Sequence, residues 1–218
     1  MIPRRALLQN LTSALLGAAA VPAAGAGEKD CPAIPALPCH IGKRGPRDGY
    51  FPDVIVTTHE GERARFYSDL VHDRVVVFNF MFTNCMDKCP MYVSNLVAVQ
   101  RLLAGRIGKD IFMYSLTLDP LVDTPKVLRE YAAEHSVGPG WKFLTGRPAD
   151  MELLRTRLGF VDPDPERDKD RANHAGLLRY GNEKIDRWSA CPALARPAEI
   201  AKFILWMFPE SGEAKDRV

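Results

Sequence analysis

The sequence predicts an α/β fold in which helices flank a central mixed sheet. Three observations lead to this prediction. Residues 75–82 form a nearly continuous apolar run of β-branched and aromatic side chains, which is typical of a strand buried on both faces. Segments with apolar residues at helical spacing follow this run and the next one, so strands and helices alternate. The chain has 218 residues, 46% of them hydrophobic, which is enough for one domain with a sizeable core.

The first half of the domain predicts a hairpin, a strand, a helix and a second strand. Residues 54–56 and 63–66 flank a short turn and predict a small N-terminal hairpin. After the apolar run, a helix is expected from about Pro90, and Gly105 stands where its C-terminal cap belongs. Residues 111–118 predict the second strand. The apolar residues at helical spacing in the helix are Tyr92, Leu96, Val99 and Leu103.

The second half begins with another helix. Thr124-Pro125 is a favourable helix start, with Thr as N-cap and Pro at the first helical position. Phe143-Leu144 predicts a short strand, residues 151–158 a further helix and residues 162–170 a polar loop. The expected buried positions in these helices are Val127, Leu128, Tyr131, Met151, Leu154 and Leu158. The remaining predicted elements are a hairpin of residues 177–180 and 184–188 around Gly181-Asn182, and an amphipathic helix with Ile200, Phe203, Ile204 and Met207.

This element order predicts the topology. Right-handed crossovers make the two main strands parallel, and the inserted hairpin extends the sheet. The result is a thioredoxin-like arrangement. Cys85 and Cys89 then lie where the first buried strand runs into its helix, at the sheet rim where such folds place ligands.

The N-terminus predicts export. Arg4-Arg5, an apolar stretch and the small residues Ala24-Gly25-Ala26 describe a secretory signal peptide over residues 1–26. The arginine pair with Leu7-Leu8 also resembles a twin-arginine export signal, and an uncleaved anchor is the remaining alternative. We expect a periplasmic or otherwise exported protein. Its expected parts are an irregular lead-in over 27–50, the thioredoxin-like domain over 51–210 and a polar tail over 211–218.

The net charge indicates no partner, and the cysteines raise a question. The formal net charge of +2 is too balanced to argue for nucleic acid or for an anionic membrane surface. We expect no nucleic-acid partner, and membrane contact only through a partner protein or an uncleaved signal. Five cysteines in an exported protein need an explanation, because oxidising compartments pair thiols. A disulfide between Cys31 and Cys39, or from one of them to Cys191, competes with a second soft metal site that includes His40.

Cys85 and Cys89 are the strongest candidates for chemistry. Their spacing of four places both sulfurs on one side of a helical turn. The helix N-terminus is expected to lower the pKa of both thiols, with Lys88 as an additional influence. Two convergent thiolates are either a redox pair or two soft metal ligands. A structural disulfide is the alternative, although such a short loop would constrain the unfolded chain little.

Residues 82–90, Phe-Thr-Asn-Cys-Met-Asp-Lys-Cys-Pro, resemble the F-T-x-C-x-x-x-C-P signature of the Sco/SenC family. The resemblance covers about residues 51–208. Where the family usually has Pro after the first cysteine, this chain has Met86, a soft thioether that is a candidate to assist copper or else packs or points to solvent. The further matching blocks are Leu118-Asp119-Pro120, Asp123-Thr124-Pro125, Leu128, Tyr131, residues 141–146 and His174.

The resemblance implies a PrrC-like copper metallochaperone of thioredoxin fold. It implies that Cys85, Cys89 and His174 hold copper as Cu(I) or Cu(II), and that the protein helps assemble the copper centre of cytochrome c oxidase. The implied partner is the copper-receiving oxidase subunit, with a thiol reductant or a copper donor as further partners. The ligand types suit copper, because thiolates select Cu(I) and imidazole accepts both oxidation states. The loop of residues 162–170 would swing His174 onto or away from the thiols, or else is simply solvated.

Other functions remain open at this point. Cys85 and Cys89 also suit a thiol-disulfide oxidoreductase that reduces the recipient's cysteines, which would make the protein an enzyme. A redox or copper sensor is a third class. A peroxiredoxin is disfavoured, because Thr83 stands one residue too close to Cys85 for the T-x-x-C element and the upstream proline is missing. We expect surface positions for His59, His72 and His135, and a solvated helix face for Arg147, Arg155 and Arg157.

Overall fold

The computed structural model describes residues 45–47, 49–85, 89–174 and 176–209, without the side chains of residues 172 and 174. The expected signal peptide, most of the lead-in and the polar tail lie outside these residues, as do Cys31, Cys39, His40, Met86 and Lys88. None of the helices in the described part of the chain combines the length and apolarity that crossing a bilayer requires.

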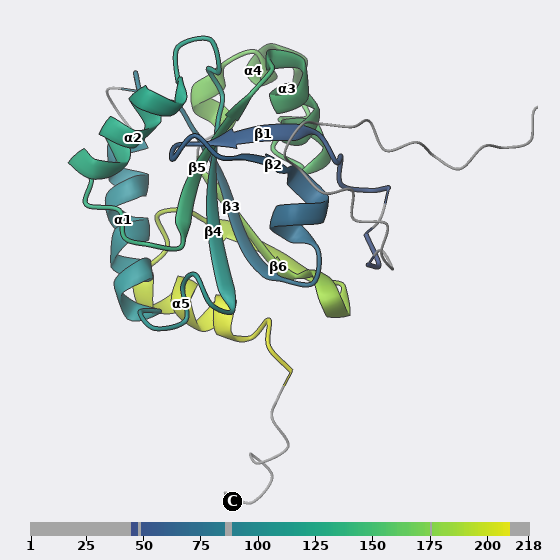
Figure 1. Ribbon diagram of the computed structural model, residues 1–218, viewed down its shortest axis with the longest axis vertical. Coiled ribbons are helices and arrows are strands. Elements are labelled where there is room, and N and C mark those ends of the chain that lie inside the picture. The colour runs from purple at the N-terminus through teal and green to yellow at the C-terminus, as the bar shows by residue number, and fades with distance from the viewer. Residues whose placement is uncertain (1–44, 48, 86–88, 175, 210–218) are drawn as a thin grey trace, which may run out of the picture. The chain divides into compact units, whose positions relative to one another are not determined.

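The domain is built on a seven-stranded mixed sheet with the strand order β2-β1-β5-β4-β3-β6-β7 (Figure 1). The three central strands β3, β4 and β5 run parallel, and all other pairings are antiparallel. The predicted mixed sheet with parallel main strands is therefore confirmed. The strands are β1 Ile55–Thr58, β2 Arg63–Arg65, β3 Val75–Met81, β4 Ile111–Thr117, β5 Trp141–Gly146, β6 Leu177–Asn182 and β7 Arg187–Pro192.

Helices cover both faces of the sheet and form two hydrophobic cores with it. The helices α1 (Cys89–Leu102), α2 (Pro125–Glu134) and α5 (Pro197–Leu205) pack on one face. The helix α3 (Pro148–Arg157) and the π-helix η1 (Phe66–Val71) pack on the other. The short helices are α4 Pro165–Asp168, η2 Arg171–His174 and η3 Glu183–Ile185.

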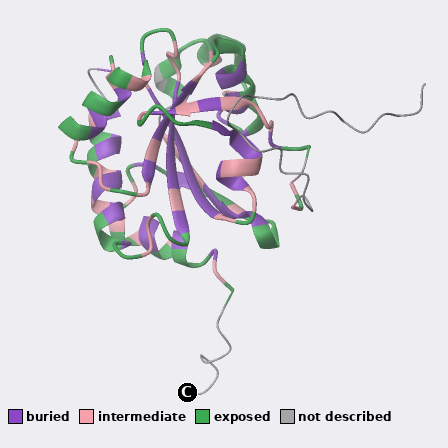
Figure 2. Cartoon of the chain, in the orientation of Figure 1, coloured by how far each residue is buried: buried purple, intermediate pink, exposed green. Residues whose placement is uncertain are grey.

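The apolar run forms the predicted central strand. All seven residues of β3 are buried, as the buried colour of the central strands in Figure 2 shows. Val75 and Val77 face the core under α1, whereas Val76 and Phe78 face the core under α3. Burying one such side chain stabilises the fold by about 1.5–3 kcal/mol, so a strand with two apolar faces belongs in the middle of the sheet.

Two of the predicted helix ends are confirmed by local structure. The Thr124 side chain accepts a hydrogen bond from the backbone N–H of Val127 (3.4 Å), with Pro125 at the first helical position. Beyond the end of α1, Gly105 has a φ of +90°, the left-handed conformation that favours glycine. Both helices therefore begin or end where the sequence indicates.

The second hairpin is present, but its turn lies later in the chain than predicted. Gly181-Asn182 is the end of β6 and not the turn, which is formed by η3 and by Asp186 with a φ of +50°. The reason is Glu183, which is only 1% exposed and accepts hydrogen bonds from the Tyr67 hydroxyl (2.7 Å) and the Asp73 amide (2.8 Å). This buried carboxylate draws the chain inward and shifts the second strand to residues 187–192, which include Cys191.

Candidate metal and thiol site

The two central cysteines meet at the predicted rim of the sheet. Cys85 follows β3 and Cys89 is the first residue of α1. The Cys89 backbone N–H donates to the Cys85 sulfur at 3.4 Å, so the two residues share one turn. No disulfide joins the two cysteines, and both are buried, with exposed fractions of 8% and 1%. This geometry presents two soft donors on the same side of the helix start, a donor set that suits Cu(I).

Burial dominates the electrostatics of Cys89. It raises the pKa of this thiol to about 12, and the neighbouring Cys85 and the charge of Asp123 add to the increase. The prediction that the helix N-terminus lowers the pKa was therefore wrong for Cys89, because the loss of hydration outweighs the helix dipole. In the reduced protein without metal, Cys89 is a neutral thiol at pH 7.

Asp123 holds the segment just before Cys85 in place. Its carboxylate is fully buried and accepts hydrogen bonds from the Thr83 amide (3.3 Å) and from the hydroxyls of Thr83 and Thr117. Thr83 lies two residues before Cys85, and Thr117 ends β4. The carboxylate thus ties the loop after β3 to the loop between β4 and α2. The sequence marks Asp123 as part of the Asp123-Thr124-Pro125 block. It does not indicate the contact with Thr83, which lies 40 residues away in the chain.

A second polar group near the thiols is the hydroxyl of Tyr131. This atom is buried and has no hydrogen-bond partner among the described residues. Burial raises the pKa of Tyr131, and the charges of Cys89 and then Cys85 raise it further, so the hydroxyl lies within electrostatic reach of both sulfurs. The sequence predicted only that Tyr131 faces the core. A buried donor near two sulfurs can hydrogen bond to a thiolate there.

The backbone of His174 ends the short helix η2, close in sequence to the start of β6. Its side chain lies outside the described residues, so the predicted third ligand stays a prediction. Gly176 lies next to Tyr92 of α1, because a Cβ built on Gly176 would be 3.3 Å from the Tyr92 hydroxyl. The segment that follows His174 therefore passes the first turns of the helix that begins with Cys89. The side chains that are described form no group of three or more His, Cys, Asp or Glu residues able to hold a metal.

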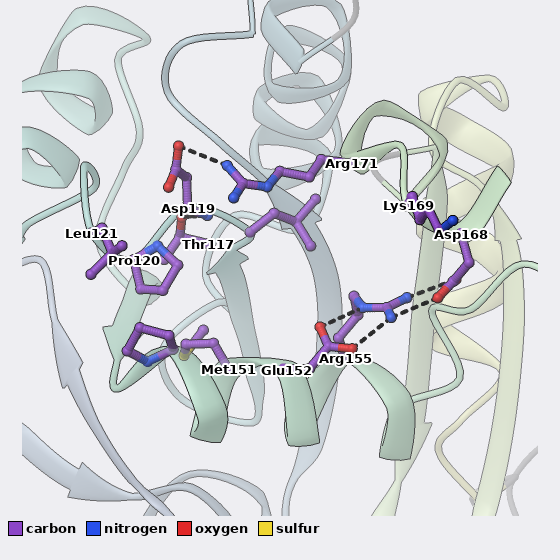
Figure 3. Close-up of a pocket in the computed structure, with 12 residues that line it drawn as sticks. Thr117, Asp119, Pro120, Leu121, Met151, Glu152, Arg155, Asp168, Lys169 and Arg171 are labelled. Carbon is purple, nitrogen blue, oxygen red and sulfur yellow. Dashed lines mark hydrogen bonds and ion pairs between the residues drawn. The ribbon is translucent and has the colours of Figure 1, made fainter. Parts of the chain in front are cut away.

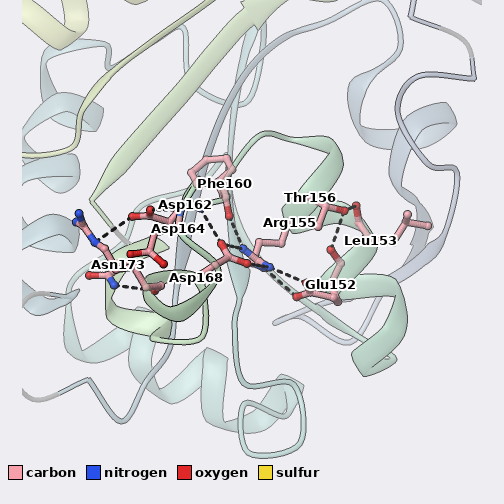
Figure 4. A network of polar contacts seen from close by, with 10 residues as sticks. Glu152, Leu153, Arg155, Thr156, Phe160, Asp162, Asp164, Asp168 and Asn173 are labelled. Carbon is pink, nitrogen blue, oxygen red and sulfur yellow. Dashed lines mark hydrogen bonds and ion pairs between the residues drawn. The ribbon is translucent and has the colours of Figure 1, made fainter.

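A buried arginine organises the segment before His174. Arg155 binds both carboxylate oxygens of Asp168 (2.9 and 2.8 Å), the carboxylate of Glu152 and the carbonyl of Phe160 (Figure 4). The expectation of a solvated Arg155 was therefore wrong, since its side chain is only 8% exposed. Arg147 and Arg157 are exposed, as predicted. The predicted polar loop contains the short helix α4, capped by Asp164, and its last part is fixed to α3.

A pocket of about 420 Å³ lies beside this network. Figure 3 shows the Arg155 ion pairs at one side of it and an ion pair between Arg171 and Asp119 at another. Met151 and Pro120 contribute apolar surface to its lining. The pocket therefore lies between the segment that leads to His174 and the loop after β4.

The other histidines and Cys191 lie in partly or fully buried places. His59 is half-buried and its Nδ1 accepts the Phe143 amide proton at 3.1 Å; burial lowers its pKa, so it is a neutral structural residue and not a surface one. Cys191 is buried within β7 and forms no disulfide with another described cysteine, whereas its predicted partners Cys31 and Cys39 lie outside the described residues; burial raises the pKa of its thiol to about 11. His72 and His135 are partly buried beside the rings of Tyr67 and Tyr131.

The family model described as SCO1/SenC matches residues 55–185, more than half of the chain and most of the domain. The chain belongs to the SCO1/SenC family. A SCO1 protein homolog from Bacillus subtilis is 35% identical to this family member over 69 residues, which are 31% of this chain and 35% of that protein. The matched stretch thus spans about one third of the relative's length.

Solved structures of Sco proteins share the fold. ScoI from Bradyrhizobium japonicum with copper bound superposes with a TM-score of 0.54 at 21% identity, over 71% of this chain and 96% of that one. BsSco is described as a member of the Sco family of cytochrome c oxidase assembly proteins in which a disulfide switch was identified. It superposes with a TM-score of 0.57 at 21% identity, over 71% of this chain and 90% of that one. These likenesses confirm the thioredoxin-like fold that the element order predicted.

Proposed function

We propose that the protein is an exported copper metallochaperone that assists assembly of the copper centre of cytochrome c oxidase. Cys85, Cys89 and His174 hold the copper, and the recipient is the copper-receiving subunit of the oxidase. The single observation that carries the proposal is the pair of buried, reduced thiols on one turn at the rim of the sheet.

The residues around the pair suit reversible metal binding. Cys89 is a neutral thiol in the metal-free protein because burial raises its pKa to about 12, and a thiol that coordinates a metal is deprotonated. Binding therefore releases a proton, and the reverse reaction can take one up. Asp123 holds the loop before Cys85 in place while this occurs. Two protein thiolates and one imidazole leave room for a ligand from the recipient, whereas a structural zinc site closes with four.

The relatives support the same function. The Bradyrhizobium protein of this fold has copper bound, and BsSco belongs to a family of cytochrome c oxidase assembly proteins. The amino-terminal 26 residues support export.

The test compares His174→Ala with Cys85→Ser. We expect both variants to lose Cu(I) affinity in a competition titration and to fail in restoring oxidase assembly to cells that lack the protein. Arg157→Ala, an exposed change on α3, is the control and should behave as wild type. A wild-type protein that is folded and reduced but does not bind Cu(I) would refute the proposal.

A thiol-disulfide oxidoreductase is the second candidate, favoured by the closeness of the two reduced cysteines. In that reaction the Cys85 or Cys89 thiolate attacks a disulfide of the recipient. The second cysteine then resolves the mixed disulfide, so the pair is oxidised as the recipient gains two thiols. This chemistry needs no imidazole ligand. Normal oxidase assembly by His174→Ala together with failure of Cys85→Ser would favour the reductase over the copper carrier.

A further inference from the structure

Among the contacts described for the histidine segment, which we define as residues 162–174, two ion pairs of unequal strength join it to the rest of the domain. The first is the Arg155–Asp168 pair, a bidentate contact in which the arginine side chain is 8% and the aspartate 24% exposed. Asp168 also accepts a hydrogen bond from the amide of Asp162 at 2.7 Å, which closes the segment on itself (Figure 4). Removing one partner of such a pair leaves a poorly hydrated charge, so this contact acts as a fixed anchor.

The second contact lies three residues from His174. Arg171 Nη1 and Asp119 Oδ2 are 2.9 Å apart, with the arginine side chain 55% and the aspartate side chain 20% exposed (Figure 3). Because more than half of the Arg171 side chain is in contact with water, this single contact is weaker than the bidentate Arg155 pair and is screened by salt. This contact can therefore open while the Arg155 anchor stays closed.

Asp119 connects this second contact to the cysteines. Its amide donates to the Thr117 hydroxyl (2.9 Å), and its carbonyl accepts the amide proton of Asp123 (2.9 Å). Thr117 and Asp123 are hydrogen bonded to each other, and Asp123 holds Thr83 just before Cys85. A continuous series of polar contacts thus runs from the turn that carries His174 to the loop that carries Cys85.

The ion pair between Arg171 and Asp119 lies at the pocket described above. Arg171 and Lys169 of the histidine segment line one part of the pocket, while Asp119 and Leu121 of the loop after β4 line another. Because the two segments border a pocket of about 420 Å³ there, the ion pair joins them where apolar packing is incomplete.

We propose that Arg171 is a positioning residue, which through its ion pair with Asp119 docks the His174 turn against the loop that supports Cys85. The ion pair sets where His174 stands relative to the thiols, and its opening releases the histidine without unfolding the segment. The copper part of this inference rests on the proposed function, but the docking part concerns the metal-free chain.

The first experiment measures hydrogen exchange in the full-length, reduced, metal-free protein. In Arg171→Gln and in Asp119→Asn, the amides of residues 171–176 should exchange about two- to fivefold faster, the range expected from loss of an exposed ion pair. The matched control is Lys169→Gln, which removes an exposed ion pair to Glu166 within the same segment (2.7 Å) and should leave that exchange unchanged. The double variant Asp119→Arg with Arg171→Asp should restore protection.

Salt provides an independent check on the same amides. Raising ionic strength to about 1 M should speed exchange in the wild type and leave Arg171→Gln unaffected, because the screened contact is already absent there. Exchange in Arg171→Gln equal to that of Lys169→Gln would overturn the docking role.

The second experiment tests the consequence for the site. The Cu(I)-loaded proteins are mixed with bicinchoninate, a Cu(I) chelator, and copper loss is followed by absorbance. We expect about two- to fivefold faster loss from Arg171→Gln than from Lys169→Gln. Faster amide exchange without faster copper loss would overturn the positioning role. A wild-type chain that takes up no Cu(I) would instead refute the proposed function, and the exchange data would still decide whether Arg171 docks the turn.

Discussion

At the scale of single residues, the buried Tyr131 hydroxyl has no hydrogen-bond partner among the described residues and lies within electrostatic reach of both sulfurs. A buried polar group without a partner costs the folded state about 1–3 kcal/mol. A neutral thiol accepts hydrogen bonds weakly, whereas a thiolate accepts them well. We therefore expect the hydroxyl to be unfavourable in the metal-free state and to gain a hydrogen-bond acceptor when the cysteines become thiolates.

This argument predicts opposite effects of Tyr131→Phe on stability and on copper binding. The free energy of unfolding of the metal-free protein should stay unchanged or rise by about 1 kcal/mol, since a buried unpaired group is removed. Cu(I) affinity should fall about three- to tenfold, as expected from one lost hydrogen bond to a charged group. Denaturant unfolding measures the free energy of unfolding, and competition with a chelator measures the Cu(I) affinity. Tyr114→Phe, in the core on the other face of the sheet, is the control that should leave copper affinity unchanged.

The pKa of Cys89 gives a prediction about pH. A thiol whose pKa is about 12 in the folded protein stays protonated at pH values where an unfolded cysteine, with a pKa near 9.0, ionises. The contribution of this thiol to the free energy of unfolding is fully present below pH 9, where the thiol is protonated in both states. It is lost as the pH rises toward 12, because the unfolded state releases the proton first. The thiolate absorbance difference between reduced wild type and Cys89→Ser should therefore stay near zero up to about pH 10. In urea the same difference should appear near pH 9, and a folded-state midpoint at or below that value would contradict the argument.

At the scale of elements, α3 and the histidine segment depend on one buried side chain. Arg155→Met removes the guanidinium from two carboxylates and from the carbonyl of Phe160. The free energy of unfolding should fall by about 2–4 kcal/mol, and exchange should accelerate over residues 160–170. Arg157→Met, an exposed neighbour, should change stability by no more than about 0.5 kcal/mol. Equal losses in the free energy of unfolding for the two substitutions would show that the buried Arg155 network does not stabilise the fold.

The elements that the sequence predicts correctly are those with local causes. The apolar run defines β3, Thr124-Pro125 defines the start of α2, and two cysteines four apart define one turn. The features that it does not predict depend on distant partners. Arg155 looks solvated until Asp168, 13 residues later, folds back onto it. The hairpin turn is displaced because Glu183 is held by a hydrogen bond from the Tyr67 hydroxyl. Tyr67 lies 116 residues earlier in the chain, so no local sequence pattern indicates that contact.

At the scale of the whole molecule, strand order explains why the site lies where it does. The parallel strands β3 and β4 end side by side, so Cys85 after β3 and Asp123 after β4 meet at one edge of the sheet. The strand β6 pairs with β3 on the other side, which brings the residues that follow His174 beside the start of α1. Segments far apart in the chain therefore meet around the start of α1. The place of Cys85 and Cys89 at the sheet rim was predictable from the order of the elements, whereas His174 was predicted only through the family resemblance.

The proposed export would decide the redox state in which this site works. An oxidising compartment would join Cys85 and Cys89 in a disulfide unless a reductant maintains the thiols. We predict that protein purified from its native compartment begins at residue 27, which mass spectrometry of the N-terminus would check. Changing Arg4 and Arg5 together to Lys should stop export if the twin-arginine system is used, and should leave it intact if an ordinary secretion signal operates. Either result supports export, whereas a cytoplasmic chain that retains Met1 would contradict it. Such a chain would have thiols kept reduced by the cytosol, and the need for a dedicated reductant among its partners would disappear.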